Sequence, residues 1–208
     1  SSDLDQNGIG MTPELRYRKY SGLDIQPVFE PLAALRIAVF RDFPYLYEGT
    51  VEYEKEYLQT YANSARSLLF TVFDGENMVG ATTALPLSDE TGEVQEPFLK
   101  TGYRPDEVFY FGESILLPPY RGLGLGHRFF DEREQHARSF GTFRYTAFCA
   151  VQRPEDHPAR PAGYRPLDAF WKKRGYQPQP ALTTTFSWPD LGETESTAKP
   201  MLFWTKAL

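Results

Sequence analysis

The most informative stretch of this sequence is Pro118-Pro119-Tyr120-Arg121-Gly122-Leu123-Gly124-Leu125-Gly126. It follows an apolar run, 115–117, and precedes a segment with helical character, 127–140. Because proline cannot donate to a strand ladder, the apolar strand must end at Pro118. Glycine accepts left-handed backbone angles, so the chain can turn tightly before the helix presents its free N–H donors and the positive end of its dipole. Strand, turn and helix start together predict an anion-binding nest, most naturally for phosphate.

The spacing of the glycines narrows the choice of phosphate ligand. Gly122, Gly124 and Gly126 follow the order Gly-x-Gly-x-Gly, whereas a dinucleotide fold uses Gly-x-Gly-x-x-Gly and an acidic residue about 20 positions later. The Gly-Lys-Ser/Thr of a nucleotide P-loop does not occur here either. The run does match Arg/Gln-x-x-Gly-x-Gly/Ala, read as Arg121, Gly124 and Gly126. With its apolar strand and its Pro-x-Tyr-Arg-Gly turn, it resembles the acetyl-CoA loop of the GNAT acetyltransferase superfamily, whose loop amides hold the CoA pyrophosphate. A strand-to-helix turn without a ligand is the alternative.

Composition limits the class of protein. The chain has 208 residues, 41% hydrophobic and 15% aromatic, which suits one domain with a packed core. Its net charge of −6 argues against nucleic acid or an anionic membrane as the main partner and is compatible with an amine substrate. Cys149 is the only cysteine, which excludes an intrachain disulfide and favours a reducing cytoplasm. The three histidines lack metal-ligand spacing, and no apolar run reaches the roughly 18 residues of a membrane span.

The first residues differ from the rest. Residues 1–10 are polar and lack the apolar segment of a signal peptide, so we expect a disordered leader or an expression remnant, with Met11 as the natural start. Residues 11–208 would then form a single domain.

The periodicity of apolar residues predicts the order of the elements. We expect strands at 15–20, 67–73, 78–87, 107–117, 143–151, 182–188 and 201–206, and helices at 28–40, 51–64 (capped by Thr50), 127–140 and 166–174. Residues 88–105 are polar and contain Gly and Pro, which predicts a loop or insertion with no more than one helical turn. This order is similar to that of GNAT proteins over residues 12–208. The resemblance implies an α/β (α+β) fold, with a mixed, largely antiparallel central sheet that is splayed at its middle and flanked by helices.

The resemblance also implies which residues meet the cofactor. In GNAT proteins the strand before the loop separates from its neighbour and leaves main-chain groups free for the pantetheine arm. The matching positions are Ile115, Leu116, Leu117, Arg121, Gly122, Leu123, Gly124, Leu125, Gly126, His127 and Trp171. Trp171 stands where the family often has a tyrosine that protonates the leaving thiolate, and an indole cannot serve as that acid. We therefore expect Trp171 to pack against the pantetheine or the core.

Glu113 is the sharpest candidate for catalysis. It lies in a strand that is apolar on both faces, where a carboxylate must find a partner or have its pKa raised by burial. Either outcome suits a group that accepts a proton from an attacking ammonium, and GNAT enzymes often have an acidic residue at this position. The alternative is a structural glutamate paired with an arginine of a neighbouring element.

The remaining candidates are aromatic. Tyr164 is the candidate general acid, with a tyrosine that only packs in its loop as the alternative. In GNAT proteins the segment between the first two helices lines the acceptor pocket, so Phe43, Tyr45 and Tyr47 join Glu113 as expected substrate contacts. A solvated acidic helix face, with its aromatic residues turned to the core, is the alternative there. Cys149 lies in an apolar strand and reads as a buried filler rather than a nucleophile.

These assignments predict an acetyl-CoA-dependent N-acetyltransferase that moves acetyl to a primary amine of a small molecule or peptide by direct attack in a ternary complex. Acetyl-CoA would be the co-substrate, without a metal, and homodimerisation is left open. One alternative is an acyltransferase with another acyl group or acceptor. The other is a non-catalytic acyl-CoA-binding sensor, which the tryptophan at position 171 would favour.

Overall fold

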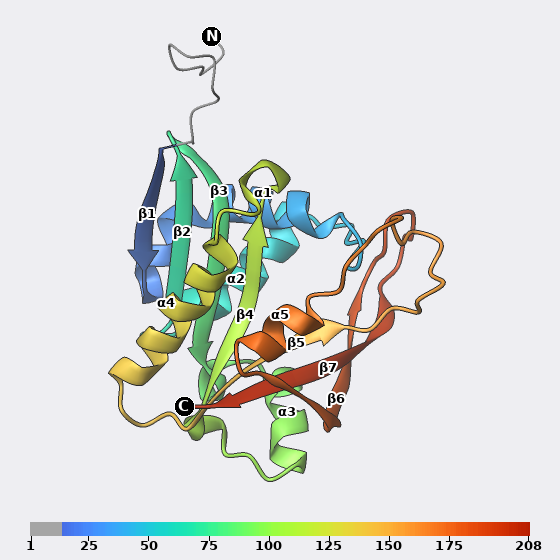
Figure 1. Ribbon diagram of the computed structural model, residues 1–208. Helices are drawn as coiled ribbons and strands as arrows, with labels where there is room; N and C mark the ends of the chain where they lie inside the picture. Colours follow the sequence, from blue (N-terminus) through green and yellow to red (C-terminus); the bar gives the residue numbers. More distant parts are fainter. Residues whose placement is uncertain (1–13) are drawn as a thin grey trace.

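The computed structural model describes residues 14–208, and a seven-stranded sheet lies at its centre (Figure 1). The strands are β1 (Leu15–Tyr20), β2 (Leu68–Asp74), β3 (Asn77–Pro86), β4 (Val108–Leu116), β5 (Tyr145–Val151), β6 (Gln177–Trp188) and β7 (Thr197–Ala207). Their order in the sheet is β1-β2-β3-β4-β5-β7-β6, and only the β4–β5 pair is parallel. The expected mixed, largely antiparallel α/β fold is confirmed. The leader expected at 1–10 lies outside the described residues.

Helices cover both faces of this sheet. They are α1 (Phe29–Phe40), α2 (Val51–Ala62), α3 (Gly92–Lys100), α4 (Leu125–Ser139) and α5 (Asp168–Lys173). In Figure 1, α4 and α5 lie in front of the sheet, and α1 and α2 lie behind it. The rear core is largely aliphatic, around Leu32 and Leu58, whereas the front core is mostly aromatic, around Phe111 and Phe130. Burial on both sides explains why the central strands are apolar on both faces.

One segment differs from the expectation drawn from the sequence. Residues 88–105, expected to hold no more than one helical turn, contain the nine-residue helix α3. Pro97 inside α3 removes a helical hydrogen bond, but Phe98 is fully buried against Phe203 of β7, with ring centroids 4.9 Å apart. The burial of this ring outweighs the lost hydrogen bond. The expectation is therefore wrong for a tertiary reason.

The starts of the other helices follow local chemistry. The Thr50 hydroxyl accepts a hydrogen bond from the Tyr53 N–H at 3.3 Å, which confirms the predicted cap of α2. Helix α4 begins at Leu125, two residues before the predicted start, because Gly124 takes the left-handed capping position with φ of 79°. The strands β6 and β7 are longer than the predicted 182–188 and 201–206.

The centre of the sheet opens between β4 and β5. These strands pair over only three residues each, Val108–Tyr110 with Tyr145–Ala147. Beyond them the two strands diverge, and β5 continues beside β7 (Figure 1). The expected splay is confirmed. It leaves main-chain N–H and C=O groups of both strands without a partner strand on the facing sides.

A bulge in β4 lies beside this divergence. Thr83 of β3 faces two residues of β4, Gly112 and Glu113. A Cβ atom on Gly112 would lie 1.9 Å from the Tyr61 hydroxyl oxygen, so only glycine fits there. The bulge thereby turns Glu113 toward the α1–α2 side, where it meets Arg36.

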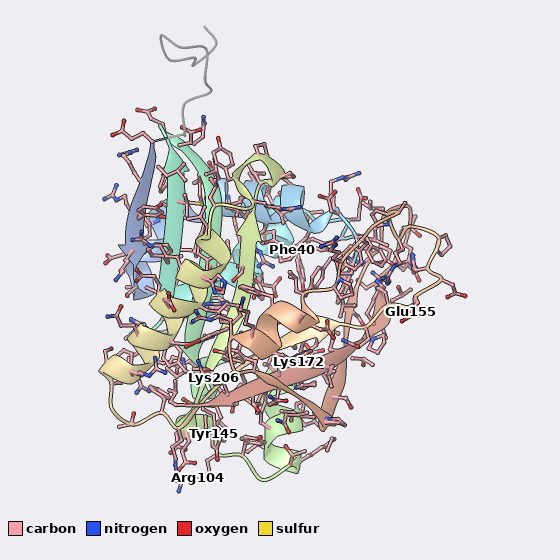
Figure 2. All side chains as sticks on the ribbon, viewed as in Figure 1. Phe40, Arg104, Tyr145, Glu155, Lys172 and Lys206 are labelled. Atoms are coloured by element: carbon pink, nitrogen blue, oxygen red, sulfur yellow. The ribbon has the colours of Figure 1, made fainter. Side chains whose placement is uncertain are left out.

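The front helices are fastened to the last strand by a buried carboxylate. Glu134 of α4 accepts hydrogen bonds from Lys206 Nζ of β7 at 2.8 Å and from the Tyr176 hydroxyl at 3.1 Å. Arg174, which follows α5, pairs with the same carboxylate at 3.3 Å. Figure 2 labels Lys206 on β7, among the side chains that fill the front layer. This cluster fixes the axis of α4 and therefore the position of its N-terminus.

Candidate active site

The glycine loop leaves both space and donors at the start of α4. Gly122 and Gly124 adopt left-handed φ angles of 80° and 79°, and a Cβ on either would meet no atom within 4 Å. The first helical hydrogen bond runs from the Arg128 N–H to Gly124 O at 3.2 Å. The N–H groups of residues 125–127 therefore precede the helical ladder and are available to an anion.

The side chains around the loop brace it rather than fill it. Arg121 Nε and Nη2 donate to the Leu116 carbonyl at 3.2 and 3.1 Å, which ties the loop to the end of β4. The His127 ring meets Phe170 of α5 edge-on, with centroids 4.7 Å apart, and a Cβ on Gly126 would lie 3.4 Å from the same phenyl ring. The position of the predicted phosphate site thus depends on contacts from both β4 and α5.

The apolar residues predicted to contact the cofactor differ in how deeply they are buried. Ile115 and Leu125 are buried, so a ligand would meet them through the main chain alone. Leu116 and Leu117 are only partly buried, and Leu123 is exposed. These three side chains are accessible beside the divergence and the loop.

Glu113 lies in a buried ionic cluster behind the sheet. Its Oε1 atom is 2.6 Å from Arg36 Nη1, in an ion pair without a well-aligned hydrogen bond. Its Oε2 atom accepts hydrogen bonds from the Thr83 hydroxyl at 2.7 Å and the Tyr57 hydroxyl at 3.1 Å. Glu113 therefore has the arginine partner that the structural alternative requires, and its part in proton transfer stays a prediction.

This cluster holds one guanidinium for two carboxylates. Arg36 Nε also donates to Glu54, which is fully buried and accepts a second hydrogen bond from the Tyr47 hydroxyl at 2.8 Å. Burial acts to lower the pKa of Arg36, but the charges of Glu113 and Glu54 raise it well above its usual value. The guanidinium stays charged, and the three ionised groups together retain a surplus negative charge.

A further buried carboxyl lies on the same side of the sheet. Glu90, in the turn between β3 and α3, is 8% exposed. Burial raises its pKa to about 7, with a smaller contribution from the charge of Glu113 and an opposing one from the Thr91 N–H. A carboxyl with this pKa changes its charge near neutral pH.

Tyrosine hydroxyls gather on the same side. Those of Tyr57 and Tyr61 are 3.2 Å apart, and that of Tyr110 is 3.2 Å from Cys149 Sγ. Burial raises the pKa of all three phenols and that of Tyr45. Burial also raises the pKa of the Cys149 thiol to about 12, so the thiol stays protonated and is a poor nucleophile.

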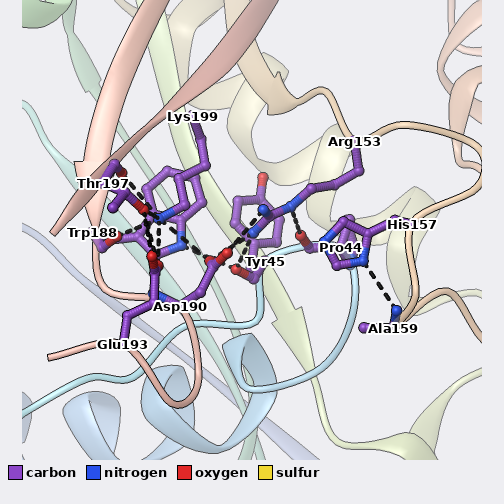
Figure 3. Close-up of polar contacts among 10 residues, drawn as sticks. All are labelled: Pro44, Tyr45, Arg153, His157, Ala159, Trp188, Asp190, Glu193, Thr197 and Lys199. Atoms are coloured by element: carbon purple, nitrogen blue, oxygen red, sulfur yellow. Dashed lines mark hydrogen bonds and ion pairs between the residues drawn. The ribbon is translucent and has the colours of Figure 1, made fainter. Parts of the chain in front are cut away.

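The aromatic loop between α1 and α2 is held by Arg153, which follows β5 (Figure 3). Its Nε donates to the Pro44 carbonyl at 2.7 Å, and its Nη2 donates to the Tyr45 carbonyl at 2.8 Å. The same guanidinium makes two hydrogen bonds to Asp190, at 3.1 and 2.8 Å. Trp188 Nε1 also donates to the Tyr45 carbonyl, at 3.0 Å. One side chain thus joins the loop, the end of β5 and the β6–β7 turn.

The structure places the three aromatic residues predicted to contact the acceptor in different surroundings. Phe43 meets Tyr164 edge-on, with ring centroids 4.9 Å apart. Burial raises the pKa of Tyr164, so its hydroxyl keeps its proton at neutral pH. Tyr47 instead belongs to the ionic cluster through Glu54. Tyr45 packs against Phe40 and Trp188, with ring centroids 4.8 and 6.0 Å apart.

Trp171 belongs to the front aromatic core. Its ring meets Phe148 of β5 and Trp204 of β7, with centroids 4.9 and 5.1 Å apart. Trp171 was expected to pack against either the pantetheine or the core, and its contacts are those of the core.

Reasoning from the sequence missed four charged residues of this region: Arg36, Glu54, Glu90 and Arg153. A signal existed for two of them. Arg36 is four residues after Leu32 on the buried face of α1, and Glu54 is four residues before Leu58 on the buried face of α2. A charge on an apolar helix face requires a partner inside the protein. Glu90 and Arg153 lie in polar segments, where no comparable pattern marks them.

Neither a metal site nor a membrane-spanning helix occurs among residues 14–208. No group of three or more His, Cys, Asp or Glu side chains in this range is arranged to hold a metal ion. None of the helices described is long and apolar enough to cross a membrane.

A sheet opened between its fourth and fifth strands, beside a glycine turn into a helix, defines an acyl-CoA-dependent transferase architecture. The model of the acetyltransferase (GNAT) family matches residues 33–176, and the chain belongs to this family. Family membership assigns acetyl transfer from acetyl-CoA as the class of reaction. No curated protein matched the sequence.

Solved structures share the fold. NAA60 from Arabidopsis thaliana, in complex with a bisubstrate analogue, has a TM-score of 0.59 at 11% identity, over 94% of this chain and 99% of that one. An N-acetyltransferase from Staphylococcus aureus Mu50 has a TM-score of 0.58 at 10% identity, over 93% and 98%. A GNAT acetyltransferase from Streptococcus pneumoniae has 0.57 at 14%, over 94% and 100%. At these identities the likeness concerns the fold alone.

Proposed function

We propose that this protein transfers an acetyl group from acetyl-CoA to a primary amine of a small molecule or peptide, by direct attack in a ternary complex. The observation that carries the proposal is the junction of three features at one end of β4. These are the divergence from β5, the open glycine turn and the free N–H groups that begin α4. A thioester lying along β4 would reach the region of Glu113 while its diphosphate stayed at the loop.

The binding roles follow from this placement. The N–H groups of residues 122–127 hold the pyrophosphate, and the main chain of 115–117 holds the pantetheine arm. Arg121 sets the loop against Leu116, and Trp171 supports β5 from the front core. Acetyl-CoA is the co-substrate in this proposal, and no metal takes part.

Glu113 is the proposed contact for the amine. The cluster of Glu113, Arg36 and Glu54 carries surplus negative charge and favours a cationic ammonium beside it. Removal of the ammonium proton to Glu113 gives the neutral amine that attacks the thioester carbonyl. Tyr164 is the proposed donor to the leaving thiolate, since its hydroxyl keeps its proton at neutral pH.

The acceptor wall is formed by Phe43, Tyr45 and Tyr47. Arg153 fixes the main chain of this loop, so the wall is rigid rather than free to close. An amine with an apolar or aromatic body suits such a wall. We place the reaction in the cytoplasm, on the basis of the single cysteine, in a domain that spans residues 11–208.

The test is release of CoA thiol from acetyl-CoA in the presence of a panel of primary amines, from alkylamines and aralkylamines to short peptides. The proposal predicts turnover with at least one amine class. It also predicts that Glu113→Gln slows transfer at neutral pH while CoA affinity is nearly unchanged. Tight CoA binding with no turnover across the panel would instead support the acyl-CoA sensor. Turnover confined to a longer acyl-CoA or to an alcohol would support the related acyltransferase.

A further inference from the structure

Arg36 of α1 joins two carboxylates and is held by both. Its Nη1 atom lies 2.6 Å from Glu113 Oε1 of β4, and its Nε atom donates to Glu54 Oε2 of α2. The guanidinium is planar and its N–H groups point in fixed directions, so contacts at two of its edges set its rotation as well as its position. At 7% exposure, Arg36 has little freedom to leave this arrangement.

Two aromatic rings lie against the same guanidinium. Its Cζ atom is 4.2 Å from the centroid of the Tyr57 ring and 5.1 Å from that of Phe40. Both are cation–π contacts, which are strongest where water is excluded. Tyr57 also donates its hydroxyl to Glu113 Oε2 at 3.1 Å, so one side chain touches both members of the ion pair.

Glu54 connects this arginine to the predicted acceptor wall. Its Oε1 atom accepts a hydrogen bond from the Tyr47 hydroxyl at 2.8 Å, while its Oε2 atom accepts one from Arg36. Glu54 is fully buried, so it acts on its neighbours in the protein rather than on a substrate. The contacts therefore run from Tyr47 through Glu54 and Arg36 to Glu113.

Glu113 has one oxygen with capacity to spare. Its Oε2 atom is engaged by the Thr83 hydroxyl at 2.7 Å and by Tyr57. Its Oε1 atom faces Arg36 in an ion pair that is not a well-aligned hydrogen bond, and it has no hydrogen-bond partner among residues 14–208. A carboxylate oxygen accepts about two hydrogen bonds, so Oε1 is the atom left for the substrate ammonium.

The direction of that oxygen decides where the amine lies. Thr83 and Tyr57 fix Oε2, and Arg36 fixes Oε1, so loss of Arg36 would leave the carboxylate free to turn about its Oε2 contacts. A misplacement of about 1 Å at a reacting group can cost about 100-fold in rate.

We propose that Arg36 is a positioning residue: it aims Glu113 Oε1 at the substrate ammonium, and Tyr47 and Glu54 hold Arg36 in place. The acceptor wall and the amine contact thereby form one rigid unit. This role rests on the proposed N-acetyltransferase function. If Arg36 served only the stability of the fold, its effect on the rate would follow from its effect on folding.

The charges of the cluster allow the two roles to be separated. Two carboxylates face one guanidinium, which leaves a surplus of one negative charge. Arg36→Met alone would leave two buried carboxylates without a cation and should destabilise the protein strongly. Arg36→Met/Glu54→Gln leaves Glu113 as the one charged group of the three, so the surplus is the same as in the wild type.

The experiment measures kcat and KM, with acetyl-CoA and the amine that the thiol-release panel identifies, together with the urea midpoint of unfolding. Arg36→Met should lower the midpoint, and Arg36→Met/Glu54→Gln should regain most of that loss because it adds no unpaired charge. The double variant should nevertheless have a kcat about 100-fold below that of the wild type, with the KM for the amine and the acetyl-CoA affinity nearly unchanged. The exposed pair of Glu96 and Lys100 supplies the matched control, since Glu96→Gln/Lys100→Met removes one charge of each sign and should keep the wild-type kcat.

A third substitution shows whether Arg36 acts through Glu113. Glu113→Gln removes the charge that attracts the ammonium, so it should raise KM and lower kcat. In Arg36→Met/Glu54→Gln/Glu113→Gln, kcat should equal that of Glu113→Gln alone, because no carboxylate is left to aim. A kcat lowered by the product of the separate effects would mean that Arg36 acts by another route and would overturn the proposal.

Arg36→Lys tests the same point in a variant that keeps the cation. An ammonium is a point charge without the planar fork, so it can balance the two carboxylates but cannot fix their directions. This variant should be more stable than Arg36→Met, with a kcat about tenfold below that of the wild type. A wild-type kcat in Arg36→Lys, or in Arg36→Met/Glu54→Gln, would show that charge alone matters and would also overturn the proposal.

Failure of the proposed function has a different signature. An enzyme inactive with every amine, or one whose kcat is unchanged by Glu113→Gln, would overturn the proposed part of Glu113 and the role of Arg36 with it. In an active enzyme that depends on Glu113, the double, triple and lysine variants decide the role of Arg36 alone.

Discussion

The charge of Glu90 should cost the folded protein stability as the pH rises, and Glu90→Gln should remove that cost. The Glu90 pKa is about 7 in the folded state, compared with an ordinary value of 4.5, and burial is the main cause. Between these two values the folded protein binds more protons than the unfolded chain. The free energy of unfolding therefore falls as the pH rises from 4.5 through 7, and the stability contribution of the neutral acid is fully present only below 4.5.

The size of the effect follows from the two pKa values. Each unit of pKa difference between the folded and unfolded states corresponds to about 1.4 kcal/mol. Ionisation of Glu90, with a pKa of about 7 in the folded state and 4.5 in the unfolded chain, therefore costs the folded state about 3 kcal/mol. Glutamine keeps the carbonyl oxygen that accepts from the Thr91 N–H but carries no charge. Wild type and Glu90→Gln should therefore be about equally stable near pH 4, while the variant should be about 3 kcal/mol more stable at pH 8.

Urea unfolding of both proteins at four or five pH values between about 4 and 8 measures this difference, since all other carboxyls are common to the two. Glu96→Gln serves as the matched control. Glu96 is exposed, and the hydrogen bond and charge of Lys100 lower its pKa. Any difference between wild type and Glu96→Gln should therefore be constant from about pH 5 to 8 and shrink only toward acid, opposite in direction to that of Glu90→Gln. A free-energy difference between wild type and Glu90→Gln that stays constant across the range would refute the assignment of a buried, titrating carboxyl.

Three further substitutions test separate parts of the structure. Gly124→Ala places a side chain at φ of 79° beside the open turn. The free energy of unfolding should fall by about 1 kcal/mol, and calorimetry should show CoA affinity reduced by about tenfold or more. An unchanged CoA affinity would show that the phosphate binds elsewhere. Gly112→Ala forces the Tyr61 hydroxyl away from β4 and should cost about 2 kcal/mol or more in urea unfolding, and a neutral result would contradict the tight contact at the bulge. Arg153→Met removes the hydrogen bonds to the Pro44 and Tyr45 carbonyls. The KM for the acceptor should rise about tenfold while acetyl-CoA affinity stays unchanged. An equal weakening of acceptor and acetyl-CoA binding would indicate a general folding defect.

The glycine turn was predictable because its determinants are local. Proline ends a strand whatever surrounds it, and Gly124 can take a left-handed angle that other residues avoid. The sequence therefore locates the end of β4 and the start of α4 to within two residues. Helix α3 was not predictable in this way. Pro97 argues against a helix locally, and only the burial of Phe98 against β7 reverses that preference.

The ionic cluster around Glu113 was likewise only partly predictable from the sequence. An acid in an apolar strand signalled that Glu113 needs a partner, but the partner, Arg36, comes from a helix 77 positions earlier and is brought to it by the fold. The bulge that turns Glu113 toward α1 depends on the ladder between β3 and β4, which periodicity does not reveal. Glu90 is less visible still, because it is buried although it lies in a polar segment with no apolar periodicity.

Titration calorimetry of acetyl-CoA and CoA into the purified chain tests the central claim most directly. The free amides at the start of α4 and the divergence of β4 from β5 predict saturable binding at one site per chain for both ligands. Gly124→Ala should weaken both to the same extent, since the turn would contact the diphosphate and not the acyl group. Absence of any binding heat, together with no change in the free energy of unfolding at saturating ligand, would contradict the account.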